Sequence, residues 1–170
     1  MGWLQDFYAR DQDWKPEPKE AAAVYRWPDR FLVHAVVATA GASMAHEPYI
    51  RLPSEASATE LGLAVVRALK VAGGVVGNWE ASKTDKGRRA LLKAAGVRSW
   101  KRFHEACHYC DVGHVQERVT VTPPENSCLT GRHKSFAFLP DAEVSCDAGA
   151  SPDVIGDAVL LGLSRCTPAL

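Results

Sequence analysis

The sequence predicts a single α+β domain in which a mainly antiparallel sheet packs with helices. Two patterns predict this class: runs of β-branched and apolar residues that are typical of strands, and amphipathic segments with helix-start signals that follow two of these runs. A chain of 170 residues is long enough to bury one substantial core, and its 46% share of hydrophobic residues is ordinary for a globular protein. We therefore expect one domain over residues 1–170.

The N-terminal part of the chain is rich in aromatic residues. Residues 1–30 combine tryptophan, tyrosine and phenylalanine with charges and two prolines, which predicts an aromatic arm with a short helix. Residues 31–38, FLVHAVVA, are largely β-branched or apolar and predict a strand. Residues 49–52 lie between Pro48 and Pro53, so we expect an edge strand there, where proline is tolerated. The two runs together predict a hairpin with a long loop.

Two later segments carry helix-start signals. Ser57 is followed three residues later by Glu60, the capping box that satisfies free amides at a helix start, and apolar residues then recur at helical spacing. Ser151 is a suitable N-cap for a second helix, because Pro152 follows at the first helical position and Asp153 lies beside the positive end of the helix dipole. The sequence thus predicts helices that begin at both serines.

These two helical segments also resemble each other. Residues 151–164 repeat residues 57–70 with a constant offset of 94, and each copy follows a strand-like run that ends in Leu-Pro. The pattern predicts two strand-then-helix units, within halves at residues 31–98 and 99–170. Chance similarity between two amphipathic helices is the alternative, because a single period cannot establish a repeat architecture. The identical pairs are Ser57 and Ser151, Gly62 and Gly156, Ala64 and Ala158, Val65 and Val159, and Leu69 and Leu163.

The segment between the two copies predicts further helices and a strand. Residues 83–97 and 99–110 have helical patterns, and residues 115–123 alternate like a strand. The second repeated helix carries Val154 and Leu161 where the first carries charged residues. A helix that is apolar nearly all round is either central in the fold or covered by another chain, and we expect this helix to be covered inside the domain.

Charge is balanced overall but divided along the chain. Lysine plus arginine and aspartate plus glutamate each total 20, so no global basic field is available to hold nucleic acid. Residues 67–102 carry ten basic and two acidic residues, a net charge of +8, whereas residues 137–170 carry five acidic residues and one basic, a net charge of −4. We expect a basic partner to bind at the acidic end. An RNA-binding module on the basic segment is an alternative, although only Trp79 and Trp100 supply aromatic side chains there.

The N-terminus and the cysteine content favour a cytoplasmic protein with no membrane partner. The first residues do not combine a basic segment with an apolar run, and no apolar stretch approaches the ~20 residues that span a bilayer. Five cysteines are an odd number at low density, which argues against the disulfide framework of a small secreted domain. We expect the cysteines to be reduced.

A cluster of histidine and cysteine residues is the one candidate for catalytic chemistry. In the predicted helix His104, Cys107 and His108 would share one face, with Cys110 close by, which is the basis for a small zinc- or thiol-dependent enzyme as the alternative function. A structural zinc site needs a second pair of ligands, and free cysteines are usually buried as small apolar groups. We therefore expect no cofactor, no metal site and no catalytic residues.

Three segments of the second half resemble a known family. They are SWKRF at residues 99–103, VTVTP at residues 119–123, and the ending at residues 138–166. The segments resemble the immunity proteins of contact-dependent growth inhibition, the CdiI family, over about the last 70 residues. The first 50 residues add nothing to this resemblance.

The resemblance implies a non-catalytic antidote that binds the C-terminal toxin domain of a cognate CdiA effector in a 1:1 complex. Such toxins are commonly nucleases, which must present positive charge to their substrate, so an acidic surface on the inhibitor would steer association. We expect no binding of nucleic acid by the immunity protein itself. The expected partner-binding residues are Asp141, Glu143, Asp147 and Asp157.

Overall fold

A six-stranded antiparallel sheet forms the centre of the molecule. The computed structural model describes residues 18–39, 43–75, 77, 85–104, 107–125 and 137–166. Neighbouring strands are antiparallel throughout the sheet, and two short strands, β6 (Pro124–Glu125) and β7 (Ala137–Phe138), pair separately. The α+β class with a mainly antiparallel sheet is therefore confirmed. The order across the large sheet is β3 (Ser43–Pro53), β2 (Arg30–Ala38), β1 (Ala21–Trp27), β4 (His108–Val115), β5 (Arg118–Thr122) and β8 (Val144–Asp147).

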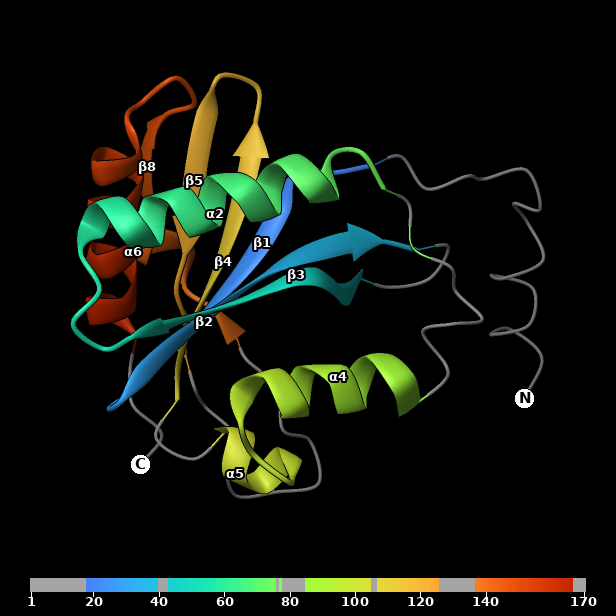
Figure 1. Cartoon of the computed structure of the whole chain (residues 1–170). Coiled ribbons are helices and arrows are strands. Elements are labelled where there is room, and N and C mark those ends of the chain that lie inside the picture. The colour runs from blue at the N-terminus through green and yellow to red at the C-terminus, as the bar shows by residue number, and fades with distance from the viewer. Residues whose placement is uncertain are drawn as a thin grey trace, which may run out of the picture.

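Helices cover both faces of this sheet (Figure 1). On one face α2 (Ala58–Ala72) and α6 (Pro152–Arg165) cross each other and enclose the larger hydrophobic core. On the other face α4 (Asp85–Ala95) and α5 (Trp100–His104) pack over a smaller, aromatic core. β1 and β2 are buried by both layers, which is why residues 31–38 form an apolar run and do not alternate with polar residues.

The predicted aromatic arm over residues 1–30 is wrong for residues 21–27, which form β1. This segment contains three consecutive alanines, which have low strand propensity, but it is hydrogen-bonded to β2 on one side and β4 on the other. Packing on both faces outweighs the local preference. The rest of the predicted arm, residues 1–17, lies outside the described residues. The predicted edge strand at residues 49–52 is confirmed, because these residues are part of β3 at the edge of the sheet.

The predicted helix over residues 99–110 is also only partly correct. The helix α5 ends at His104, and β4 begins at His108. Cys110 faces the larger core under α6, while the next residue along, Asp111, faces the opposite side of the sheet. Period-two alternation therefore governs this stretch, and the helical spacing of its histidines and cysteines is coincidental.

The two halves of the sheet are related by constant residue offsets. The β1–β2 hairpin corresponds to the β4–β5 hairpin at an offset of 88, and β3 with α2 corresponds to β8 with α6 at an offset of 94. Strand pairing shows this directly: Arg30 pairs with Pro53 in the first half, and the residues at the offset positions, Arg118 and Asp147, pair in the second. The resemblance of the two helices thus corresponds to an approximate two-fold symmetry of the fold, which runs from β1 to α2 and again from β4 to α6. The second Leu-Pro run is not the counterpart of the first, because residues 137–138 form β7 in the separate sheet and the strand before α6 is β8.

The repeated glycines lie where the two helices cross. A Cβ atom at Gly62 of α2 would overlap the carbonyl group of Pro152 in the first turn of α6. Reciprocally, a Cβ atom at Gly156 of α6 would overlap the carbonyl group of Ala58 in the first turn of α2. Pro152 is itself the counterpart of Ala58 at the offset of 94. The contact is therefore symmetric, and only glycine allows the two backbones to approach so closely.

Candidate partner-binding site

The four predicted contact residues lie along one edge of the molecule. Asp141 is in a 3-10 turn at Pro140–Ala142, Glu143 precedes β8, Asp147 ends β8, and Asp157 is on α6, which packs against β8. All four are exposed, and β8 is an edge strand. They do not form one tight cluster, because Glu143 and Asp147 are roughly 13 Å apart at about 3.3 Å per strand residue. We call these four residues the acidic edge.

Two arginines lie close to the acidic edge, but their hydrogen bonds go elsewhere. Arg165 donates to the backbone carbonyls of Ala142, at 3.0 Å, and Glu143, at 3.2 Å. Arg118, which pairs with Asp147 across the two strands, donates to Ser145 Oγ. In the part of the chain that the structure describes, neither arginine forms an ion pair with the acidic edge. The four carboxylates are thus available to cationic groups of a partner.

The outer face of α6 adds apolar surface beside this edge. Val154 is 43% exposed and Leu161 is 46% exposed, so the prediction that α6 is covered all round is wrong. The helix buries Ile155 and Leu163 against the sheet, which leaves the opposite face without a covering element among the described residues. Asp157 lies between the two exposed side chains at helical spacing. A mixture of apolar and acidic side chains of this kind is typical of a protein-binding surface.

The histidine and cysteine cluster does not form a site. His104 ends a helix, Cys107 is buried in the aromatic core, and His108 and Cys110 lie in β4, where the Nδ1 atom of His108 is 3.3 Å from the carbonyl oxygen of Leu163. Burial raises the pKa of the Cys107 thiol well above its usual range, which keeps it protonated. Among the described residues no group of three or more histidine, cysteine or acidic side chains is arranged to hold a metal ion. The zinc- or thiol-dependent alternative assumed that His104, Cys107 and His108 share one face of a helix, and this assumption is wrong.

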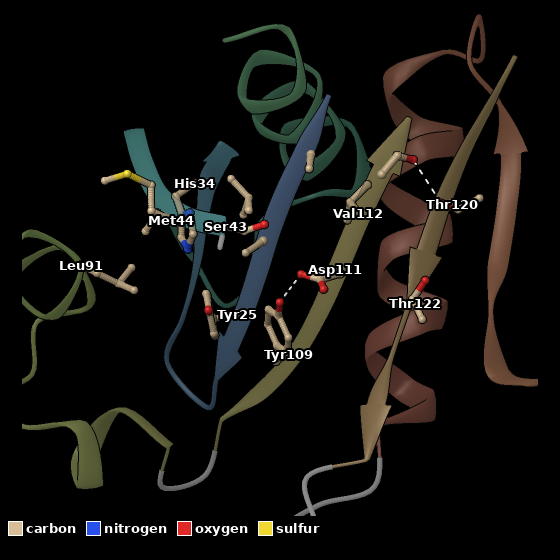
Figure 2. Close-up of a pocket in the computed structure, with 15 residues that line it drawn as sticks. Tyr25, His34, Ser43, Met44, Leu91, Tyr109, Asp111, Val112, Thr120 and Thr122 are labelled. Atoms are coloured by element: carbon tan, nitrogen blue, oxygen red, sulfur yellow. Dashed lines mark hydrogen bonds between the residues drawn. The ribbon is translucent and has the colours of Figure 1, made fainter. Parts of the chain in front are cut away.

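A cavity of about 460 Å³ opens on the sheet face opposite α2 and α6, and the sequence analysis missed it (Figure 2). Asp111 of β4 lines the cavity, and the hydroxyl group of Tyr109 donates a hydrogen bond to the carboxylate of Asp111. Burial raises the pKa of Asp111, and the hydrogen bond from Tyr109 partly offsets this effect. His34 of β2 also lies in the wall, where it is 2% exposed. We call this the sheet-face cavity.

The histidine in the wall presents an unsatisfied acceptor. The Nδ1 atom of His34 is 2.8 Å from the carbonyl oxygen of Ala35, which requires Nδ1 to carry the proton and donate it. Burial lowers the pKa of His34 to about 4, so the ring is neutral near pH 7. Its Nε2 atom is then a bare acceptor, and it has no hydrogen-bond partner among the described residues. A signal for this cavity was present in the sequence, since an aspartate in the middle of a strand is unusual.

Comparison with known proteins identifies the family. The family model of the CDI immunity proteins, CdiI, matches residues 79–166, which is more than half of the chain. The chain belongs to the CDI immunity protein family. All three segments that carried the sequence resemblance, at residues 99–103, 119–123 and 138–166, lie inside the match. No protein among the curated sequences matches this CDI immunity protein.

Two solved structures share the fold of this CDI immunity protein. A protein of unknown function from Neisseria meningitidis has a TM-score of 0.70 at 17% identity, over 91% of this chain and 99% of the other. A CdiA-CT/CdiI toxin and immunity complex from Yersinia pseudotuberculosis includes a chain with a TM-score of 0.68 at 17% identity, over 86% of this chain and 97% of the other. None of the described helices in this CDI immunity protein is both long and apolar enough to cross a membrane. The family match includes the acidic edge and Asp111, whereas His34 lies outside it.

Proposed function

We propose that this CDI immunity protein neutralises the C-terminal toxin domain of a cognate CdiA effector by binding it in a 1:1 complex. Membership of the family supports the immunity role, and the structural neighbour from Yersinia pseudotuberculosis is a CdiA-CT/CdiI complex. We place the toxin-binding surface at the acidic edge because its four exposed carboxylates lie beside the exposed side chains of Val154 and Leu161. In this proposal the protein acts by occupying the toxin and not by catalysis.

The charge of the acidic edge favours a nuclease as the toxin. A nuclease presents lysine and arginine side chains to the phosphates of its substrate, and carboxylates on the inhibitor complement those same groups. Attraction between opposite charges raises the association rate and excludes partners with acidic surfaces. The exposed apolar side chains of α6 then supply buried area once the two proteins are in contact.

The proposal is tested first by co-expression. The domain encoded at the 3′ end of the gene immediately upstream is expressed alone and together with the immunity protein. We expect the domain alone to stop growth, and we expect co-expression to restore growth and yield a complex that purifies at 1:1. Toxicity that persists during co-expression, with no complex recovered, would refute the proposed function.

The contact surface is tested by kinetics of association. A variant with Asp141→Asn, Glu143→Gln, Asp147→Asn and Asp157→Asn should associate with the toxin domain about tenfold more slowly at low salt, and the difference should shrink at high salt because exposed charges are screened. The matched control is Glu47→Gln, an exposed carboxylate on β3 at the opposite edge of the sheet, which should leave the rate unchanged. Equal rates for the quadruple variant and the wild type at low salt would remove the acidic edge from the interface.

A further inference from the structure

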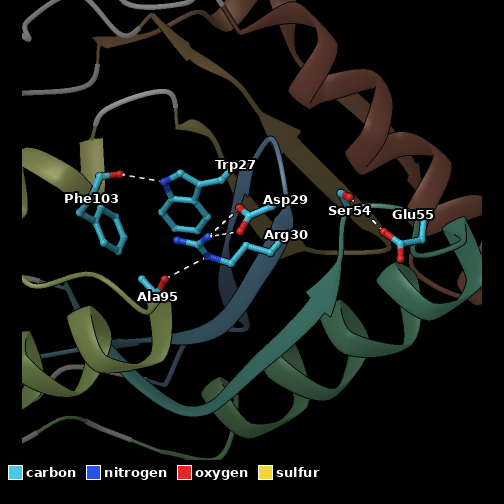
Figure 3. A network of polar contacts seen from close by, with 7 residues as sticks. All are labelled: Trp27, Asp29, Arg30, Ser54, Glu55, Ala95 and Phe103. Carbon is cyan, nitrogen blue, oxygen red and sulfur yellow. Dashed lines mark hydrogen bonds and ion pairs between the residues drawn. The ribbon is translucent and has the colours of Figure 1, made fainter.

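The sheet-face cavity exists because the two halves of the sheet are covered unequally on this side. The end of the β1–β2 hairpin anchors α4 and α5 over the first half (Figure 3). Trp27 Nε1 donates to the carbonyl oxygen of Phe103 at 3.2 Å, and Arg30 Nε donates to that of Ala95 at 3.0 Å. Both carbonyls lie in the last turn of a helix, where the helix itself offers them no partner. The segment that connects the two repeats thus covers the first of them.

The second repeat has smaller or more polar side chains at the equivalent positions. Thr120 and Thr122 of β5 occupy the places that Leu32 and His34 occupy in β2, at the offset of 88. Both threonines are half-buried, whereas Leu32 and His34 are buried. At the same offset of 88, Gly113 of the second repeat corresponds to Tyr25 of the first repeat, which belongs to the smaller, aromatic core. The missing side-chain volume leaves the cavity open beside the centre of the sheet.

The groups that line the cavity are complementary to an organic cation. Asp111 supplies a carboxylate, and the rings of Tyr25 and Tyr109 stack at 4.8 Å in the wall. None of the residues that line the cavity is a lysine or arginine, so no described cation of the wall neutralises the carboxylate. An ammonium or guanidinium group would donate hydrogen bonds to the carboxylate of Asp111 and contact the aromatic rings.

We propose that the sheet-face cavity receives a lysine or arginine side chain of the toxin domain. This inference rests on the proposed function, because the toxin is the source of the side chain. The position of the cavity supports that source: β5, which lines it, lies directly beside β8, which carries part of the acidic edge. Strands are about 4.8 Å apart, so the cavity and the edge are close enough to lie within one standard interface of about 800 Å² per partner.

The two surfaces differ in how a substitution changes the kinetics. The acidic edge is exposed and acts on association, whereas a charge pair in the cavity is partly removed from water and acts on dissociation. Asp111→Asn keeps the shape of the side chain and removes its charge. We expect the complex of this variant with the toxin domain to dissociate about thirtyfold faster or more, at low and high salt alike.

Two further variants make the result specific to the cavity. Thr122→Val is the matched control, because it alters a neutral side chain of the same wall and should leave dissociation within about twofold of the wild type. Gly113→Val fills the cavity at a strand position and keeps Asp111, so it should also speed dissociation. Thermal unfolding of each free variant checks that the variant is folded. If Asp111→Asn does not fold, the dissociation rate of the Gly113→Val complex tests the proposal.

A scan of the toxin identifies the partner side chain. Each lysine and arginine of the toxin domain is replaced by methionine and combined with Asp111→Asn in a double-mutant cycle. We expect the methionine substitution at one toxin position to weaken binding to the wild-type immunity protein. The same substitution should not weaken binding to Asp111→Asn any further. If folded Asp111→Asn and Gly113→Val both bind with wild-type kinetics while the quadruple acidic-edge variant associates slowly, the cavity proposal is overturned and the proposed function stands. Failure of the wild-type protein to bind the toxin at all overturns both.

Discussion

At the scale of single residues, His34 shows how burial sets chemistry. The ring of His34 stacks with Tyr25 at 5.7 Å and is tilted against Tyr49 at 5.8 Å, and its Nδ1 atom donates to the carbonyl oxygen of Ala35. Burial lowers the pKa of His34 to about 4. The histidine is therefore neutral in the folded protein under conditions where an exposed histidine would begin to bind a proton.

This lowered pKa predicts a loss of stability in acid. An unfolded histidine has a pKa of about 6.5, so between about pH 6.5 and 4 the unfolded chain binds more protons, and the contribution of His34 to stability falls as the pH falls. At pH 5 the loss is about 2 kcal/mol relative to pH 7.5. The variant His34→Phe should therefore lose about 2 kcal/mol less stability over this range than the wild type, as measured by urea unfolding at the two pH values.

The comparison separates His34 from other titrating groups. The raised pKa of Asp111 has the opposite effect, because the folded state then binds the proton more tightly and gains stability as the pH falls. This contribution is present in both proteins and cancels in the difference between them. An identical pH dependence for His34→Phe and wild type would show that His34 does not titrate with a lowered pKa.

At the scale of elements, the crossing of α2 and α6 joins the two repeats on one face of the sheet. Both helices begin at a serine N-cap, and the capping box predicted for α2 is confirmed, with the backbone amide of Ser57 bonded to Glu60 Oε2 at 2.8 Å. Capping and periodicity are local properties, so the sequence reveals them directly. The partner of each glycine is not local, because it lies in the first turn of the other helix.

The close contact between α2 and α6 predicts that even alanine at Gly62 or Gly156 lowers the stability of the protein strongly. Gly62→Ala and Gly156→Ala should each destabilise the protein by about 2 kcal/mol or more, because the added methyl group forces the helices apart. Alanine favours a helix over glycine by about 1 kcal/mol, so an open helical site would show the opposite sign. Thermal or urea unfolding measures the change.

Gly149→Ala is the matched control for the helix crossing. A Cβ atom at Gly149, in the turn before α6, would meet no atom within 4 Å, so this substitution should change stability by less than about 0.5 kcal/mol. Stabilisation by alanine at Gly62 or Gly156 would mean that the helices do not touch at these residues.

At the scale of the whole molecule, the two repeats depend on each other. β1 and β4 pair at the centre of one continuous sheet, and α2 and α6 share one core above it. The exposed basic residues of α4 lie on one face of this sheet, and the acidic α6 lies on the other. The division of charge along the sequence thus corresponds to a division in space for α4 and α6, whereas Arg67 and Lys70 of the basic segment lie on α2, on the same face as α6.

This shared core predicts that neither repeat folds alone. Fragments of residues 18–75 and 107–166 each expose half of the core and an unpaired central strand, so each should be largely unfolded by far-UV circular dichroism. The full chain should unfold in one transition that is the same by far-UV and near-UV circular dichroism. A folded fragment, or two separate transitions in the full chain, would contradict the interdependence of the repeats.

Features that depend on local physics could be predicted from the amino-acid sequence. Caps and helical spacing predicted α2 and the start of α6, and matching residues in the two segments predicted their relationship. Charge counting predicted an acidic end, and three short segments indicated the family. The role of the acidic residues in binding stays a prediction.

The strands β1 and β4 and the sheet-face cavity depend on contacts between distant parts of the chain. β1 is a strand because β2 and β4 pair with it on both sides, although its alanines favour other structures. The cavity combines Tyr25 and His34 with Tyr109 and Asp111, which lie far apart in the chain. Strand register joins such residues through long-range backbone hydrogen bonds, and the periodicity of a single segment carries no information about which distant strand will pair with it.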